Sequence, residues 1–184
     1  MILMDDTAFV ASLRSSFNSG ENLRYIFFWG HQIGKAGITA SCFSQWYRAP
    51  FIIEGLRFPT AEHFMMAEKA SLFGDQESRE KILQAPDPRG AKALGRQVRG
   101  FDEAVWIRHR FPIALRANRA KFAQNPALGQ FLQESGKRVL VEASPVDRVW
   151  GVGLAQDDKR ITNPNLWRGL NLLGFALMQV RDDG

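Results

Sequence analysis

The sequence contains a single cysteine, Cys42, and only three histidines among its 184 residues. One thiol cannot form an internal disulfide or build a cysteine-rich zinc site. Because the chain needs no oxidising surroundings, we expect a reducing, cytoplasmic compartment. No histidine has a second one three or four residues away, so the usual spacing of a zinc site is missing. We therefore expect neither a metal ion nor a cofactor.

Long apolar runs are also missing. The longest strongly apolar stretch covers residues 25–29, far short of the ~20 residues that cross a bilayer, and predicts no membrane partner. The first ten residues, MILMDDTAFV, have no basic start and turn acidic early, so we expect no signal peptide. No repeat, low-complexity tract or linker divides the chain. The sequence predicts one domain at 25–184, with an N-terminal helix and linker at 1–24 that pack on it.

The charge is unbalanced toward the basic side. Twenty-four Lys and Arg against nineteen Asp and Glu give a net charge of +5. A basic surplus suits nucleic acid, an anionic membrane surface or a phosphorylated small substrate, and it also suits mere solubility. The clearest basic stripe is formed by Arg89, Lys92, Arg96 and Arg99, whose spacing keeps them on one side of a helix. Such a face either holds phosphate or is simply solvated.

Hydrophobic periodicity and turn residues predict an α+β fold, a single helix-rich domain with a few short strands. Strands are expected at 25–29 and 138–142, with a hairpin at 51–58 that turns at Glu54-Gly55. Proline after a capping residue marks two helix starts, at Asp87-Pro88 and Asn125-Pro126. The other expected helices begin at Thr7, Thr60, Asp75, Asp102 (with Pro112 expected to kink or divide it) and Asn163. The helix from Asp87 is expected to reach Val98, and the last one to be clearest from Gly169 to Arg181.

The segment Pro59 to Ala70 (PTAEHFMMAEKA) is the most informative. Glu62 falls in the first turn of the expected helix, where the dipole and free N–H groups favour a carboxylate. Lys69 lies on the same stripe of a helix that is apolar over most of its surface, which suggests a lined pocket. The alternative is a glutamate that merely favours the dipole. His63 is best read as a core or capping histidine.

A second candidate site is the loop SPVDRVWGVG at Ser144 to Gly153, which follows a predicted strand. It carries Asp147 and Trp150, and a tryptophan on a glycine-flanked loop can stack on a planar ring. Trp106 is either a further stacking residue or core packing. Carboxylates with aromatic platforms suit glycosidic-bond hydrolysis. Motifs for a serine nucleophile elbow, a dinucleotide-binding loop, a Walker lysine or a CxxC pair are missing.

The order of several motifs resembles the NADAR family of YbiA-like proteins, from about Tyr25 to Arg181. The shared segments are Phe28-Trp29, PTxEH at Pro59 to His63, AKxxGRxV at Ala91 to Val98, Trp106, KFxQN at Lys121 to Asn125, LVEASxxDxxWGxG at Leu140 to Gly153, and GxNxLGxxLMxxR at Gly169 to Arg181. The resemblance implies a YbiA-like fold. Two positions depart from the family pattern, Cys42 and Met66, and both replace a polar residue near the expected pocket.

The resemblance also implies an activity, since characterised members of the family are N-glycosidases. It implies Glu62 as the essential carboxylate, with Asp147 assisting. The residues expected to bind substrate are Trp29, Phe43 (within the loop Ser41 to Phe43), Trp106, Trp150 and Asn171, with Lys69 and Arg96 as phosphate contacts.

We therefore expect a metal-independent N-glycosidase that cleaves a phosphorylated ribosyl compound. The first expectation is a phosphoribosylaminopyrimidine intermediate of riboflavin synthesis, with release of ribose 5-phosphate. The alternative substrate is ADP-ribosylated guanine in nucleic acid. A third reading, from another class, is a module that binds ADP-ribose or a nucleotide without cleaving it. The oligomeric state does not follow from the sequence.

Overall fold

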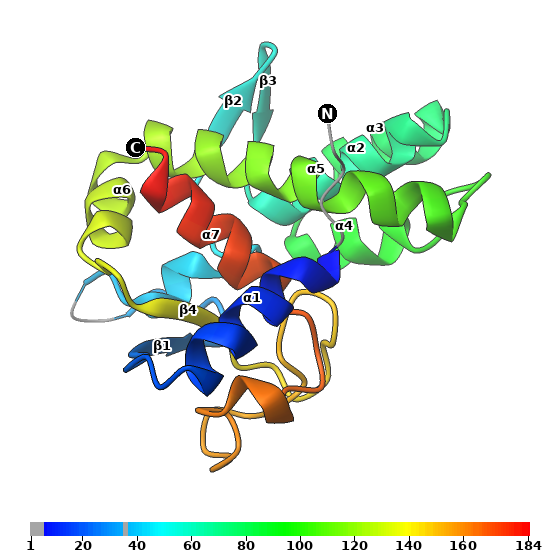
Figure 1. Cartoon of the computed structure of the whole chain (residues 1–184). Helices are drawn as coiled ribbons and strands as arrows, with labels where there is room; N and C mark the ends of the chain where they lie inside the picture. The colour runs from blue at the N-terminus through cyan, green and yellow to red at the C-terminus, as the bar shows by residue number, and fades with distance from the viewer. Residues whose placement is uncertain (1–5, 35–36) are drawn as a thin grey trace.

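The computed structural model describes residues 6–34 and 37–184, and the first five residues of the expected N-terminal segment lie outside that range. The helix-rich α+β fold expected from the sequence is confirmed: within the described residues the chain forms seven α-helices, two short 3-10 helices and four short strands (Figure 1). In chain order these are α1 (Asp6–Asn18), β1 (Tyr25–Phe28), η1 (Ala40–Phe43), β2 (Phe51–Ile53), β3 (Leu56–Phe58), α2 (Ala61–Leu72), α3 (Gln76–Leu83), α4 (Pro88–Gly95), α5 (Glu103–Gln124), α6 (Pro126–Gln133), β4 (Val139–Glu142), η2 (Pro164–Leu166) and α7 (Leu172–Asp182).

The predicted capping residues begin four of the helices. In each case the side-chain oxygen of the cap accepts a hydrogen bond from a backbone N–H of the first turn, which satisfies an otherwise unpaired donor. The caps are Thr60 for α2, Asp75 for α3, Asp87 for α4 and Asp102 for α5. Asn125 precedes α6 but does not cap it, because its amide donates instead to the carbonyl oxygens of Pro50 and Lys121.

Two helix boundaries, and the interior of a third helix, differ from the sequence expectation. Helix α4 ends at Gly95 rather than Val98, since the backbone N–H of Arg99 donates to the Asp75 carboxylate and draws the chain away. Helix α7 begins at Leu172, because Asn171 adopts the left-handed conformation (φ 53°) and its amide is used elsewhere. Helix α5 continues through Pro112 without division.

The first and last strands of the fold pair in parallel, although the order of elements along the chain gives no sign of a parallel sheet. The register places Tyr25 opposite Val139 and Phe28 opposite Glu142. Since the carboxyl ends of parallel strands lie at one edge, the residues after Phe28 meet those after Glu142. Strands β2 and β3 form the expected hairpin, which projects from the body of the molecule (Figure 1). Positive φ at both Glu54 and Gly55 fits its tight turn.

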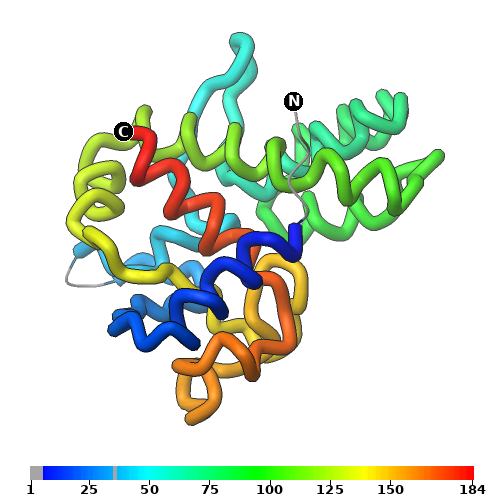
Figure 2. The backbone as a smooth tube through the Cα atoms, in the orientation of Figure 1, coloured from blue at the N-terminus to red at the C-terminus, as the bar shows by residue number. Residues whose placement is uncertain are grey.

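Helix α5 runs across the molecule and contacts α7 as well as α2 (Figure 2). Helix α7 also covers β4, and Gly174 allows this approach, because a Cβ there would lie 2.1 Å from the carbonyl oxygen of Leu140. Helix α1 packs on the same body through buried Val10 and a buried ion pair between Asp6 and Arg110 (2.7 Å). Among the described helices, none combines the length and the apolar character needed to span a membrane.

The apolar core divides into three clusters of buried side chains, one around α2 and the hairpin, one around β4 and α1, and one around η1 and α6. The Trp150 side chain is half-buried and packs against all three of them. The loop that follows β4 therefore anchors the parts of the fold to one another. It lies at the same edge as the carboxyl ends of the parallel strands, which makes that edge a rigid support for a site.

Candidate active site

A cavity of about 350 Å³ opens at the carboxyl ends of β1 and β4. Strand β1 leads into its aromatic wall, β4 supplies a carboxylate, and the loop after β4 supplies a second one. Helix α4 and the segment after η1 complete it with a lysine and a second tryptophan. The lining residues are Trp29, Gly30, His31, Ser44, Trp46, Lys92, Glu142, Ser144, Val146 and Asp147.

Glu62 lies in the first turn of α2, directly behind this wall. The Thr60 cap starts the helix, and the backbone N–H of Glu62 donates to the carbonyl oxygen of Gln45 (3.0 Å), one residue before Trp46. The side chain is 5% exposed. Burial raises the pKa of Glu62 to about 7, against the lowering effects of Lys92 and of a hydrogen bond from Trp46. Glu62 thus interacts with two lining residues although it does not itself line the cavity.

Glu142 ends β4 and lines the cavity itself. Its backbone N–H donates to the Asn171 side-chain oxygen (3.0 Å), which fixes the end of the strand. Its Oε2 is shielded from solvent and has no hydrogen-bond partner among the described residues. Burial raises the pKa of Glu142 to about 8, the negative charges of Asp147 and Glu62 raise it too, and Lys92 opposes them.

Asp147 organises the loop after β4. Its Oδ1 accepts hydrogen bonds from the backbone N–H groups of Val149 (2.9 Å) and Trp150 (2.8 Å), and its own N–H donates to the Ser144 hydroxyl. The Asp147 charge also raises the pKa values of Glu62 and Glu142. Asp147 therefore holds the loop in shape and adds negative charge to the cavity.

The cations come from one face of α4, as the basic stripe predicted. Lys92 lines the cavity, and its Nζ lies 5.8 Å from the centre of the Trp46 ring, within cation–π range. Arg96, one turn further, is exposed and lowers the pKa of Glu62. Arg99 is used elsewhere, because it pairs with Asp75 (2.8 Å) and Glu77 (3.0 Å). The stripe thus divides into residues that serve the site and one that serves the fold.

The predicted aromatic binding residues separate in the structure. Trp29 lines the cavity and is 62% exposed, as a stacking platform requires. Trp106 lies in α5 beside Lys69, whose Nζ donates to the carbonyl oxygen of Gly95 (2.8 Å) and lies 4.2 Å from the centre of the Phe101 ring. Trp106 and Lys69 therefore form a separate cluster and do not line the cavity.

Phe43 and Asn171 lie behind the cavity and do not line it. Phe43 is fully buried and packs edge-on against Phe28. Asn171 is also fully buried, and its amide bridges the backbone of β4 by accepting from Glu142 and donating to the carbonyl oxygen of Leu140 (2.9 Å). Neither side chain lines the cavity, but Asn171 holds a residue that does.

The two departures from the family pattern fall in the core. Cys42 is fully buried, and Met66 packs against Gly95, where a Cβ would lie 2.1 Å from the methionine sulfur. The buried Lys121 next to Cys42 donates to the carbonyl oxygens of Cys42 (2.6 Å) and Ser44 (2.8 Å). This clamp holds the segment that continues into Trp46, so the departures change packing behind the cavity wall.

The lining residues that were not predicted as site residues include Trp46, Lys92 and Glu142. Lys92 belongs to the basic stripe, for which phosphate binding and simple solvation both stayed open, and Glu142 belongs to the motif at Leu140 to Gly153 without a role of its own. Trp46 stood in no motif. The signal for Glu142 was a carboxylate placed directly after an apolar strand, and only the parallel pairing of β1 with β4 reveals where it lies.

Two further cavities adjoin the first and share its residues His31 and Trp46, whose rings lie 5.5 Å apart. One has a volume of about 350 Å³ and includes Arg48, and the other has about 220 Å³ and includes Arg89. His63 lies in the wall of the larger one, buried and hydrogen-bonded to the Thr60 hydroxyl (2.7 Å), as a capping histidine. The site thus continues past the His31–Trp46 wall toward two exposed arginines.

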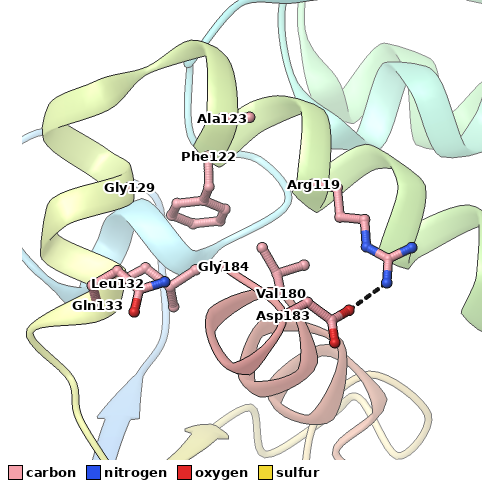
Figure 3. Close-up of a pocket in the computed structure, with 9 residues that line it drawn as sticks. All are labelled: Arg119, Phe122, Ala123, Gly129, Leu132, Gln133, Val180, Asp183 and Gly184. Carbon is pink, nitrogen blue, oxygen red and sulfur yellow. Dashed lines mark hydrogen bonds and ion pairs between the residues drawn. The ribbon is translucent and has the colours of Figure 1, made fainter.

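A separate cavity of about 350 Å³ lies between α5, α6 and the end of α7 (Figure 3). Figure 3 shows its two charged side chains, Arg119 and Asp183, paired with each other. The remaining lining is largely apolar, and the cavity contains none of the predicted site residues. Among residues 6–34 and 37–184, no cluster of three or more His, Cys, Asp and Glu side chains has an arrangement that could hold a metal ion.

The comparisons with known proteins agree with this fold. Residues 27–183 match the NADAR domain. N-glycosidase R617 of Acanthamoeba polyphaga mimivirus is 41% identical over 168 residues, which cover 89% of this chain and 98% of that protein. N-glycosidase YbiA of Escherichia coli (strain K12) is 30% identical over 140 residues, which cover 76% of this chain and 79% of YbiA.

Two further comparisons concern the fold and a longer relative. The NMR structure of E. coli YbiA has a TM-score of 0.69 and 28% identity, and covers 87% of this chain and 84% of that one. The chloroplastic riboflavin biosynthesis protein PYRR of Zea mays is 34% identical over 133 residues, 68% of this chain but 20% of that protein. The expected YbiA-like fold is confirmed, and the chain belongs to the NADAR family.

Proposed function

We propose that this chain is an N-glycosidase that hydrolyses the bond between a ribose carrying phosphate and the nitrogen of a planar base. The glycosidase class follows from NADAR membership and from two relatives named N-glycosidases. As substrate we propose first a phosphoribosylaminopyrimidine intermediate of riboflavin biosynthesis, with ribose 5-phosphate released. The maize relative, named a riboflavin biosynthesis protein, supports this choice.

The observation that carries the proposal is the buried Glu62 carboxyl behind a cavity walled by Trp29 and Trp46. A carboxylate whose pKa lies near neutrality can take a proton from water at the pH of the cell. In the proposed reaction Glu62 orients and deprotonates the attacking water, and its charge stabilises the oxocarbenium-like ribose of the transition state. Asp147 assists, because its negative charge raises the pKa of Glu62 and so its basicity.

The walls of the cavity suit the two ends of such a substrate. Trp29 and Trp46 offer aromatic faces on which a pyrimidine can stack. Lys92, with Arg96 beyond it, offers positive charge to the phosphate. In this proposal Trp29 and Trp46 take the stacking role that the sequence had suggested for Trp106 and Trp150.

A second candidate substrate is ADP-ribose attached to guanine in nucleic acid. It is favoured by the two cavities beyond the His31–Trp46 wall, because they add room and two arginines, Arg48 and Arg89, for a second nucleoside and its phosphates. A polymer substrate predicts binding that weakens steeply with salt, since phosphate contacts release counterions. A small phosphoribosyl substrate predicts a much shallower dependence.

The test is turnover by the purified chain of the riboflavin intermediate and of ADP-ribosylated guanine oligonucleotides, with free ribose 5-phosphate or ADP-ribose as product. Replacing Glu62 by Gln should lower kcat roughly 10²–10⁴-fold on whichever substrate is cleaved, because the amide cannot accept the proton. Glu80→Gln, on the exposed face of α3, is the matched control and should leave kcat unchanged. Saturable binding without product would identify a binding module, and full turnover by Glu62→Gln would remove Glu62 from the mechanism.

A further inference from the structure

The carboxyl of Glu142 has more negative than positive groups near it, and its Oε2 lacks a hydrogen-bond donor among the described residues. It lines the cavity at the end of β4, and its Oε2 is shielded from solvent without a partner among the described residues. An ionised oxygen in that position would lose its hydration and receive no hydrogen bond in return. Protonation of the carboxyl removes that cost, and the half-buried Glu142 side chain carries the proton at the wall of the cavity where a ligand would lie.

Within the described residues, three charged groups act on the pKa of Glu142. Asp147 on the following loop and Glu62 on α2 raise its pKa, and Lys92 on α4 lowers it. From α7, Asn171 contributes only a neutral amide, which is occupied by the backbone of Glu142 and Leu140. Three carboxyls therefore share one lining cation, and the arrangement favours retention of a proton among them.

The proton is best placed on Glu142. Glu62 receives a hydrogen bond from the Trp46 side chain, and because an indole N–H only donates, this bond stabilises the ionised form of Glu62. Asp147 accepts hydrogen bonds from two backbone N–H groups through its Oδ1. Oε2 of Glu142 has no such donor within the described chain. Of the three carboxyls, Glu142 is therefore the one whose surroundings most favour the neutral acid.

We propose that Glu142 is the general acid of the reaction and donates its proton to the leaving nitrogen of the base. This rests on the proposed N-glycosidase function. The bond between ribose C1′ and the nitrogen breaks with its electron pair on nitrogen, and that nitrogen takes the Glu142 proton. Water forms the new C1′–O bond and gives a proton to Glu62. The proton on Glu62 then passes to Glu142 through solvent, which restores the starting state.

An acid at this position supplies what the leaving group needs. The nitrogen of an amine or of a base leaves poorly as an anion, and protonation in the transition state removes that charge. Glu142 lines the cavity from the end of β4, and Glu62 lies behind the Trp46 wall at the start of α2. This arrangement allows the acid and the water-activating carboxylate to act on the two partners of the same bond.

The experiment compares the wild type with Glu142→Gln, Glu142→Asp and the surface control Glu80→Gln on the substrate that the wild type cleaves. Glu142→Gln keeps the size of the side chain but has no proton to give, so its kcat should fall roughly 10²–10⁴-fold. A 5-phosphoribosyl pyridinium serves as second probe, because its ring nitrogen leaves neutral without protonation. On that probe Glu142→Gln should lose less than tenfold, whereas equal losses on both substrates would overturn the proposal.

The pH dependence of the rate tests the assignment of Glu142 without the pyridinium probe. The acid must be protonated, so the wild-type rate should fall as pH rises through about 8, the pKa to which burial raises Glu142. Glu142→Asp should keep this alkaline limb at a lower rate, and Glu142→Gln should lose it. An unchanged alkaline limb in Glu142→Gln overturns the assignment. If the wild type cleaves no substrate, it is the proposed function that fails, and the two failures are thus distinguishable.

Discussion

The ammonium group of Lys92 is the cation that acts on the carboxyl groups both in and behind the cavity. It lies on α4, faces Trp46 and lowers the pKa values of both Glu62 and Glu142. It therefore does two things in the proposed reaction. It attracts the phosphate of the substrate, and it keeps Glu62 sufficiently acidic to be ionised near neutral pH.

Replacing Lys92 by Met should move the whole pH profile toward alkaline values. Without the positive charge the pKa of Glu62 rises, so the limb on which Glu62 must be ionised moves up from about 7. The pKa of Glu142 also rises, and the alkaline limb follows it. Near pH 7 the rate should fall by up to roughly tenfold for every pH unit that the Glu62 limb moves, and KM for the phosphorylated substrate should increase.

The control for this variant is Lys159→Met, which removes an exposed charge from the loop before η2. Its pH profile and KM should match those of the wild type. A Lys92→Met profile with both limbs unmoved would show that Lys92 does not act on the carboxyls.

At the level of residues, the sequence predicted the candidates that stand in a motif or shortly after a helix cap. Glu62 is a candidate because it begins a helix after a capping residue, and Asp147 because it follows a strand on a glycine-flanked loop; Asp147 lines the cavity and Glu62 lies behind it. Lys69 and Trp106 share the apolar surroundings of true pocket residues, and only the fold shows that they face each other instead. Periodicity assigns residues to a face of a helix, but it does not say what that face meets.

Among the elements, β4 and α7 are joined by one residue, Asn171, which bonds the end of the strand and begins the helix. The Asn171 amide bonds the backbone of β4 at Glu142 and Leu140, while its own left-handed backbone begins α7. Gly174, one turn into the helix, lies against the same amide and the same carbonyl. Glu142 is consequently held by α7, an element that does not itself line the cavity.

Asn171→Ala should therefore lose both stability and activity. Two backbone groups lose their partner, at roughly 1–3 kcal/mol for each that stays buried and unpaired, and an alanine tolerates the left-handed conformation less well than asparagine. We expect a lower midpoint of chemical denaturation and, for the folded fraction, a lower kcat with little change in KM.

Asn165→Ala is the matched control, because Asn165 is exposed and, within the described part of the chain, its side-chain amide donates to another exposed side chain, that of Asn18. An Asn171→Ala protein with wild-type stability would contradict the role derived for the junction. Wild-type kcat in a destabilised variant would show that the clamp serves the fold alone.

The elements themselves were predictable to the extent that local signals define them. The Asp and Thr caps, the hairpin turn and the last strand were all visible in the chain. The end of α4 and the start of α7 were misplaced, because both depend on bonds to distant residues, Asp75 in one case and β4 in the other. The parallel pairing of β1 with β4 has no local signal, although it is what assembles the cavity.

For the whole molecule, part of the net charge of +5 can be placed in the structure. Lys92 and Arg96 serve the first cavity, and Arg48 and Arg89 serve its neighbours. Several other arginines are neutralised in ion pairs, as in Arg110 with Asp6. Part of the basic surplus therefore lies at the cavities, which suits an anionic substrate of either size considered above.

Also at this scale, two tryptophans have different roles. Trp29 belongs to the cavity, and Trp150 belongs to the packing of the fold. Trp29 is largely exposed at the mouth of the cavity, whereas Trp150 packs against all three core clusters. Trp29→Ala should leave the denaturation midpoint within error and raise KM, because a stacked base is worth roughly 1–3 kcal/mol, about 5- to 150-fold. Trp150→Ala should cost roughly 3–5 kcal/mol of stability, the range for a large aromatic side chain removed from a packed position.

The two variants are best compared under identical conditions, with unfolding and kinetics measured on the same preparations. Trp150→Phe completes the series, since it keeps an aromatic ring between the clusters and should recover most of the lost stability. A Trp150→Ala protein that unfolds like the wild type but binds substrate poorly would place Trp150 on the substrate. In that case the loop after β4 would act as a binding platform, and the connection among the three clusters would have to come from other residues.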